Sequence, residues 1–269
     1  MCRTEQQVKS ILNRNRAFKR VVFTGGEPCL RADLVNLVTY AKSVGFTDIQ
    51  IQSNGRMFMY KGFCKELIDV GVNEFALAIH GHNANIHDFL TSAEGSFVQT
   101  IKGLINLKDL KQYVITNTVI TKTNYTYIPQ IAQLLIKLDI AHFQFSFVHI
   151  IGRAWTNKDW IVPRKSAIMP YLTKGLQIGL QAGKRVTTEA LPYCIMQDYK
   201  DCIVERLIPP SKVYELDKVI NDLRTYRILK KKAKRKKCFT CSYYQMCEGP
   251  WKEYPRLFGW DEFIPIKKT

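Results

Sequence analysis

Three closely spaced cysteines near the C-terminus are the residues best suited to chemistry in this sequence. Cys238, Cys241 and Cys247 follow a Cys-x-x-Cys pattern with a third cysteine six residues further on. Such spacing is typical of metal sites, because soft thiolates bind zinc and iron–sulfur clusters. Cys194 is the candidate fourth ligand, with Cys202 as its rival. The pattern predicts a metal centre at Cys194, Cys238, Cys241 and Cys247 that holds an iron–sulfur cluster or zinc, the alternative being free thiols.

A second candidate site is the segment Thr24-Gly25-Gly26-Glu27-Pro28, which follows an apolar stretch. Two consecutive glycines let main-chain groups approach a ligand closely, because no side chain intervenes. Glu27 can either fix the turn or meet a cationic group. A glycine pair alone is common in turns, but its place at the end of a predicted strand favours a binding loop.

The remaining cysteines and the histidines give a weaker signal. Cys29 and Cys64 are expected to pack in or near the core, since free cysteine behaves as a small apolar residue. His80, His82 and His87 follow a strand pattern and invite a metal interpretation. Loop-end histidines more often hydrogen-bond the backbone, and we adopt that interpretation.

The elements that position these residues alternate between strand and helix up to about residue 150. The chain opens with a helix whose capping box pairs Thr4 with Gln7. Such alternation implies a largely parallel sheet, in which ligands bind at the carboxyl ends of the strands. An order that starts with a helix leads us to expect that the first strand is missing, a genuine helix-first variant being the alternative. We expect strands at 20–24, 48–53, 74–79, 113–120 and 142–150, with helices marked by apolar stripes between them.

The βα period ends after Gly152. We expect a helix over 165–182, a short strand over 185–188 and a charged helix over 213–232. The predicted organisation is therefore a first domain over 1–155 and a cysteine-bearing C-terminal extension over 156–269.

Phe23 to Pro28, read as Phe-Thr-Gly-Gly-Glu-Pro, resembles the second-strand motif of the radical S-adenosylmethionine (SAM) superfamily. That motif binds the methionine end of SAM through backbone groups. Further segments resemble the family over nearly the whole chain: Ser53 to Gly55 its third-strand end, Ala78 to Gly81 with His87-Asp88 its fourth-strand loop, Asn117 with Lys122 to Asn124 its ribose region, and Val148 to Gly152 its adenine-flanking segment.

The resemblance implies an α/β fold, a partial (βα)6 barrel of parallel strands. It also implies SAM as cofactor, with Gly25, Gly26, Glu27, Pro28, Ser53, Asn54, Asn117 and Val148 as its binding residues.

The chemistry implied is that of the family. Three cysteines in Cys-x-x-x-Cys-x-x-Cys spacing hold a 4Fe–4S cluster, which cleaves SAM reductively to a 5′-deoxyadenosyl radical that abstracts hydrogen from a substrate. This spacing does not occur in the sequence, and Cys2 stands alone and too close to the glycine pair. We therefore expect the sequence to begin after the cluster loop, and we assign no catalytic residue. The substrate is unknown, a peptide being the candidate, and the implied electron donor is a protein such as ferredoxin or flavodoxin.

The C-terminal cysteines resemble those of SPASM or twitch extensions, which bind an auxiliary 4Fe–4S cluster. The sequence departs from the SPASM pattern, because Trp251 stands where a further cysteine would fall.

Charge and hydropathy indicate which binding partners and which cellular location the chain is expected to have. Lys and Arg number 40 against 23 Asp and Glu, a formal charge of +17, which attracts polyanions such as nucleic acid or an acidic peptide. The densest basic stretch, 227–237, is either a charged linker or a binding surface. No apolar stretch reaches the roughly 18 residues that cross a bilayer, and no signal peptide precedes the first helix, so we expect a cytoplasmic protein without membrane contact. The alternatives to an enzyme are a catalytically inactive SAM-binding partner protein and a metal-stabilised nucleic-acid-binding protein.

Overall fold

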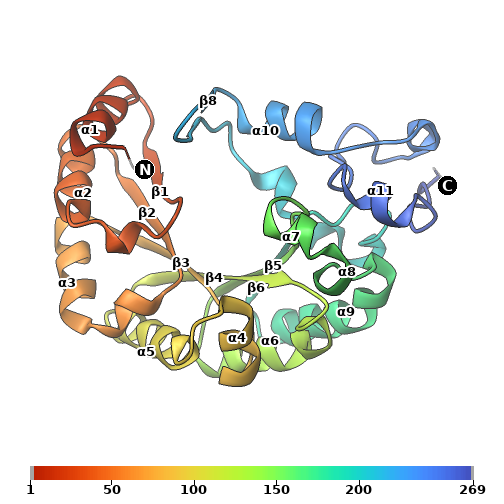
Figure 1. Cartoon of the computed structure of the whole chain (residues 1–269), viewed down its shortest axis with the longest axis horizontal. Helices are drawn as coiled ribbons and strands as arrows, with labels where there is room; N and C mark the ends of the chain where they lie inside the picture. The colour runs from red at the N-terminus through yellow and green to blue at the C-terminus, as the bar shows by residue number, and fades with distance from the viewer. Residues whose placement is uncertain (1–2, 268–269) are drawn as a thin grey trace. The chain divides into compact units, whose positions relative to one another are not determined.

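The computed structural model describes residues 3–267 and contains a six-stranded sheet (Figure 1). The strands lie in the order β1-β2-β3-β4-β5-β6, so each neighbours the next along the chain. Pairing from β1 to β4 is parallel. The predicted α/β class is confirmed. The strands are β1 Arg20–Phe23, β2 Asp48–Ser53, β3 Glu74–Ala78, β4 Tyr113–Ile120, β5 His142–Phe147 and β6 Arg185–Glu189.

The chain divides into two compact units. The first holds the described residues up to Thr118 together with Leu134–Phe143, and the second holds Val119–Gln133 and the described residues from Gln144 onward. The domain boundary near residue 155 stays a prediction.

Helices follow the strands of the first unit as the apolar stripes predict. Helix α2 buries Leu34, Leu37, Val38 and Ala41 and gives way to Gly45, whose positive φ suits a helix end. The capping box of α1 forms, with the Thr4 and Gln7 side chains each accepting the other's backbone N–H. Figure 1 shows α1, α2 and α3 following one another along this unit. Its helical elements are α1 Glu5–Arg14, η1 Pro28–Leu30, α2 Leu34–Ser43, η2 Arg56–Met59, α3 Lys61–Val70, α4 Ala84–Thr91 and α5 Ser96–Asp109.

The second unit contains one long helix and many short segments. Helix α9 begins at a fully buried lysine, Lys165, and keeps its apolar face inward through Ile168, Leu172 and Leu176. The helical elements from β4 onward are η3 Tyr125–Tyr127, α6 Ile128–Lys137, α7 Arg153–Thr156, α8 Lys158–Ile161, α9 Lys165–Gln181, η4 Gln197–Cys202, η5 Val204–Leu207, α10 Leu223–Tyr226, the π-helix η6 Arg227–Lys231, η7 Lys236–Thr240 and α11 Tyr254–Phe258. A small antiparallel sheet pairs β7 Val213–Tyr214 with β8 Val219–Ile220.

The charged helix expected over 213–232 is wrong. The segment instead holds the β7–β8 pair, α10 and η6. Asp222 starts α10 by accepting the backbone N–H of Thr225, which separates it from the preceding hairpin. The short strand expected at 185–188 forms as β6, but it belongs to the main sheet. Helix α4 was not expected. Among the described residues, no helix combines the length and apolar character needed to cross a membrane.

Candidate functional site

The turn after β1 has an open backbone. Gly25 has φ +87° and Gly26 φ +55°, and a Cβ added to either would meet no atom within 4 Å. The left-handed backbone at Gly25 explains the glycine, since other residues are strained there. The free space beside both residues lets a ligand approach the main chain. The turn therefore has the shape expected of a binding loop.

Glu27 fixes this turn to the end of β2. Its Oε1 accepts hydrogen bonds from the Ser53 hydroxyl at 2.8 Å and the Cys29 backbone N–H at 3.1 Å. Its Oε2 accepts the backbone N–H of Asn54 at 2.7 Å. Of the two roles open to Glu27, the structure shows that of fixing the turn, and it brings Glu27, Ser53 and Asn54 together.

The other residues assigned to SAM belong to later strands of the chain. Asn117 is on β4 of the first unit, paired with Ala78, and its carbonyl accepts the backbone N–H of Ile79 at 3.1 Å. Val148 follows β5 in the second unit and is 6% exposed. The structure thus places Asn117 within β4 rather than at its end, and both Asn117 and Val148 remain assignments by resemblance.

The remaining chemistry-bearing side chains of the first unit are structural. Burial is the main reason that the pKa of Cys29 is raised to about 12 and that of Cys64 to about 11, so both stay neutral thiols. The ring of His87, 1% exposed, accepts the backbone N–H of His80 through Nδ1 at 3.0 Å. Burial lowers the pKa of His80 to about 4. The core position of both cysteines and the backbone hydrogen bond of His87 are confirmed.

The C-terminal cysteines line one cavity of about 30 Å³ in the second unit. Cys194, Cys238, Cys241 and Cys247 all contribute to its wall. Aromatic and proline rings complete the lining, among them Pro192, Tyr193, Tyr244, Trp260 and Phe263. Cys202 is not part of this lining. The structure therefore favours Cys194 over Cys202 as the fourth member of the set.

The thiols lie within electrostatic reach of one another. The pKa of Cys194 is raised to about 12, first by burial and then by charge on Cys247, Cys241 and Cys238. Burial also raises the pKa of Cys247, and the backbone N–H groups of Tyr193 and Gly249 oppose the rise. The Gly249 N–H lies 3.3 Å from the Cys247 sulfur. A main-chain donor therefore serves this sulfur, an arrangement that stabilises a thiolate.

The fit of a metal centre rests on this donor set. Four soft sulfur ligands around one apolar cavity suit zinc or an iron–sulfur cluster. Within residues 3–267, no three or more His, Cys, Asp or Glu side chains form a group that could hold a metal ion as they stand. The sulfurs line a cavity wall rather than converge on one point.

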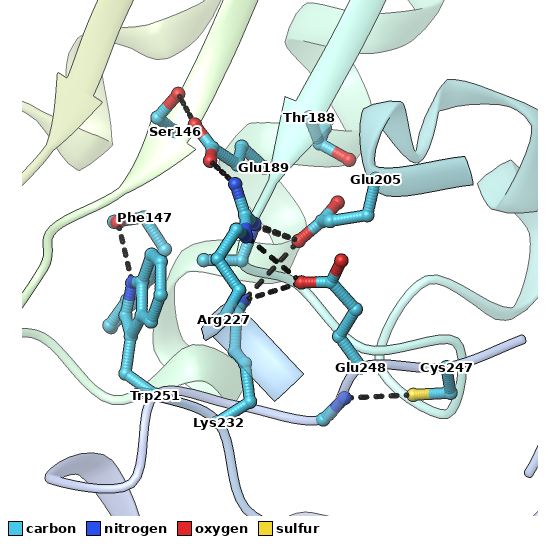
Figure 2. Close-up of polar contacts among 12 residues, drawn as sticks. Ser146, Phe147, Thr188, Glu189, Glu205, Arg227, Lys232, Cys247, Glu248 and Trp251 are labelled. Carbon is cyan, nitrogen blue, oxygen red and sulfur yellow. Dashed lines mark hydrogen bonds and ion pairs between the residues drawn. The ribbon is translucent and has the colours of Figure 1, made fainter. Parts of the chain in front are cut away.

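A buried charge cluster, missed at the sequence level, lies beside the cysteine segment (Figure 2). Arg227 meets three carboxylates: Nη1 lies 2.7 Å from Glu189, Nε 3.1 Å from Glu248, and Nη2 3.5 Å from Glu205. Lys232 adds a second cation, 3.4 Å from Glu205 and 4.0 Å from Glu248. We call these five residues the Arg227 cluster. Charge alone could not reveal it, because its members are scattered through the chain.

The Arg227 cluster connects the end of β6 with the segment that carries Cys247. Glu189 ends β6, and its Oε2 accepts the Ser146 hydroxyl of β5 at 3.3 Å. Glu248 directly follows Cys247. One oxygen of Glu205 and one of Glu248 are buried and have no hydrogen-bond partner among residues 3–267.

Trp251 extends the cluster to the end of β5. Its ring lies 3.8 Å from the Lys232 ammonium and stacks on His149 with centroids 3.9 Å apart. The indole N–H points at the carbonyl of Phe147, 3.5 Å away. The position where the SPASM pattern has a cysteine is thus filled by a packed aromatic ring.

Comparison with family models and with curated proteins shows which sequences the chain is similar to. Residues 3–135 match the model described as the radical SAM superfamily. An AdoMet-dependent heme synthase of Oleidesulfovibrio alaskensis is 30% identical over 134 residues, which cover 50% of this chain and 34% of that protein. A PqqA peptide cyclase of Rhodopseudomonas palustris is 26% identical over 155 residues, or 58% of this chain and 39% of that protein. The matches thus span well under half of these relatives' length.

Solved structures share the fold over a longer range. Streptococcus suis SuiB bound to S-adenosylmethionine has a TM-score of 0.64 at 14% identity, with 100% of this chain and 70% of that chain covered. Native anSMEcpe with bound AdoMet and Cp18Cys peptide has a TM-score of 0.67 at 13% identity, covering 97% of this chain and 88% of that one. The shared fold confirms the partial barrel. The family match is to residues 3–135, and the enzymes of the radical SAM superfamily use SAM and a 4Fe–4S cluster.

Proposed function

We propose that this chain binds SAM at the Gly25–Pro28 turn and works, within a radical SAM enzyme, in reductive SAM cleavage and hydrogen abstraction from a substrate. The observation that carries the proposal is the open turn at the carboxyl end of β1, which two hydrogen bonds to Glu27 fix to the end of β2 and a third, from Cys29, holds in shape. When bound together, SAM and the family's cluster supply a carbon-centred radical. The residues of this chain orient the cofactor and exclude water.

Each proposed SAM-binding residue has a distinct part. Gly25 and Gly26 offer main-chain groups through open space, and Pro28 begins the short helix η1. Glu27 and Ser53 hold the turn in shape, which leaves the Asn54 side chain at the same strand edge. Asn117 and Val148 complete the proposed set for the ribose and adenine. Binding in this form needs little rearrangement of the turn, since Glu27 already holds it.

A peptide is the substrate class we propose. SuiB has been solved bound to precursor peptide SuiA, and anSMEcpe with a peptide, while one curated relative is a peptide cyclase. The formal charge of +17 favours an acidic peptide in particular. The heme synthase relatives make a tetrapyrrole the competing class. We further propose an external electron donor of the ferredoxin or flavodoxin type.

We also propose that Cys194, Cys238, Cys241 and Cys247 hold an auxiliary 4Fe–4S cluster. Support comes from their shared apolar cavity and from the Gly249 N–H that donates to the Cys247 sulfur. Aromatic rings form part of the cavity wall and limit the access of water. Solvent exposure is one of the features that set the reduction potential of a cluster. Zinc bound at the same thiols is the outcome that would contradict the cluster.

The SAM proposal is tested with a matched pair of glycine variants. Gly25 and Gly45 both have positive φ, +87° and +105°, and an added Cβ meets nothing at either. The two Gly→Ala changes therefore impose similar backbone strain, about 1–2 kcal/mol, but only Gly25 lies at the proposed site. We expect Gly25→Ala to weaken binding of radiolabelled SAM in equilibrium dialysis about tenfold or more, while Gly45→Ala binds as the unmodified chain does.

Equal SAM binding by the two variants would show that SAM does not bind at this turn. The reaction itself is tested on the full-length protein by anaerobic formation of 5′-deoxyadenosine with dithionite as reductant. If the protein binds SAM but forms no 5′-deoxyadenosine, it is a catalytically inactive SAM-binding protein.

A further inference from the structure

The hydroxyl of Tyr193 is a buried polar group without a hydrogen-bond partner among the described residues. Tyr193 is 4% exposed, and its Oη makes no hydrogen bond. Buried hydroxyls in native proteins are almost always paired, because an unpaired one has lost its water without replacement. The unpaired Oη therefore points to a group that is not part of the polypeptide.

The surroundings of Tyr193 indicate what that group is. The residue lines the same cavity as the four cysteines and directly precedes Cys194. Its backbone N–H is one of the groups that hold down the pKa of the Cys247 thiol. Its ring stacks on Tyr243 with centroids 4.8 Å apart and planes 16° apart, which holds the ring in place.

We propose that the Tyr193 hydroxyl donates a hydrogen bond to a sulfur of the cluster held by Cys194, Cys238, Cys241 and Cys247, and thereby sets its reduction potential. This inference rests on the auxiliary cluster proposed above. Reduction adds negative charge to the cluster, so a donor to its sulfurs stabilises the reduced form more than the oxidised form. Tyr193 thus acts on the reduction potential of the metal centre through a hydrogen bond to sulfur.

A rival partner for the hydroxyl is a buried water. Glu205 has an unpaired buried oxygen in the same unit, and a water that bridged it to Tyr193 would satisfy both groups. In that case the hydroxyl would have no effect on the cluster.

The test is an EPR-monitored redox titration of the anaerobically reconstituted chain. Tyr193→Phe removes only the hydroxyl. Tyr243→Phe is the matched control, since its ring forms the other half of the stack while its hydroxyl accepts the Lys200 ammonium at 3.1 Å. We expect Tyr193→Phe to keep its iron and to become harder to reduce by a factor of about ten, a shift of about 59 mV toward negative potential for one electron. Tyr243→Phe should leave the potential unchanged.

The outcomes separate this inference from the proposal beneath it. If the unmodified chain assembles no iron–sulfur cluster, the auxiliary cluster fails and Tyr193 has no such role. If the cluster forms but its potential is the same in Tyr193→Phe, or shifts equally in both variants, only the Tyr193 inference is overturned. If Tyr193→Phe loses its iron, a variant with 3-fluorotyrosine at position 193 is titrated in its place. The more acidic phenol is a stronger donor, so the potential must then move in the positive direction.

Discussion

Single residues distinguish the proposed metal ligands from cysteines that only pack. Cys194 lines the cavity of Cys238, Cys241 and Cys247, whereas Cys202, eight residues further on, lies outside that lining and is 4% exposed. The sequence offered both as the fourth ligand, because spacing alone cannot tell which side chain a loop turns toward a site. Geometry makes the choice.

This pair gives a direct prediction. Cys194→Ala removes one of four ligands, so it should lower the iron content of the reconstituted chain by more than half. Cys202→Ala deletes a buried sulfur of similar size and should keep the full iron content while losing about 1–2 kcal/mol of unfolding free energy. Iron and sulfide analysis with urea unfolding measures both. Full iron in Cys194→Ala together with loss in Cys202→Ala would reverse the assignment.

At the scale of elements, local patterns predicted most of the first unit and little of the segment before the cysteines. The stripe Leu34, Leu37, Val38, Ala41 and the strand 48–53 were predictable because one apolar face and one period decide them. The segment 213–232 has no such face. Its structure depends on Arg227 and Lys232 turning inward to carboxylates far away in sequence. Long-range charge pairing leaves no periodic trace.

The same pairing makes the π-helix η6 sensitive to one charge. Arg227→Met leaves the buried carboxylates of Glu205 and Glu248 with Lys232 as their sole remaining cation in the cluster, and it removes the cation that Glu189 contacts. We therefore expect a loss of about 3 kcal/mol of unfolding free energy. Lys230→Met alters an exposed residue of the same helix and should cost less than about 0.5 kcal/mol. Urea unfolding followed by circular dichroism compares them. Equal stability of the two variants would show that the Arg227 cluster contributes nothing to the fold.

For the whole molecule, two partly buried histidines predict a loss of stability on mild acidification. Burial lowers the pKa of His80 in the first unit and of His149 in the second to about 4. An unfolded histidine titrates near 6.5, so between these values the unfolded chain binds more protons than the folded chain. The stabilisation is therefore complete above about pH 6.5 and is lost as the pH falls toward 4.

We expect the unfolding free energy to drop by about 2 kcal/mol between pH 7 and pH 4.5, less than full linkage gives, because both rings remain partly exposed. Urea titrations across this range measure the drop. The double variant His80→Gln and His149→Gln supplies the control, since it must show a flatter profile. An identical profile in that variant would assign the acid sensitivity to other groups.

The basic stretch 227–237 shows how burial can change the meaning of a charge pattern for the whole protein. Its eight Lys and Arg residues suggested a solvated linker or a nucleic-acid surface. In the structure Arg227 and Lys232 are buried, Lys234 donates to the Tyr244 carbonyl at 2.6 Å, and Arg235 to the Phe263 carbonyl at 2.7 Å. Half of the basic groups are therefore occupied within the fold, which weakens the nucleic-acid interpretation.

The inward turn of these side chains also bears on proteolysis. Trypsin cleaves after lysine and arginine, and a flexible linker with eight such residues would be the first place it cut. The protease binds several consecutive residues in extended form. Here Arg227, Lys232, Lys234 and Arg235 are each held by contacts within the fold, so the exposed lysine between Arg227 and Lys232 is fixed on both sides. Cleavage within 227–235 must therefore wait for local unfolding of the segment, and its rate reports how often the Arg227 cluster opens.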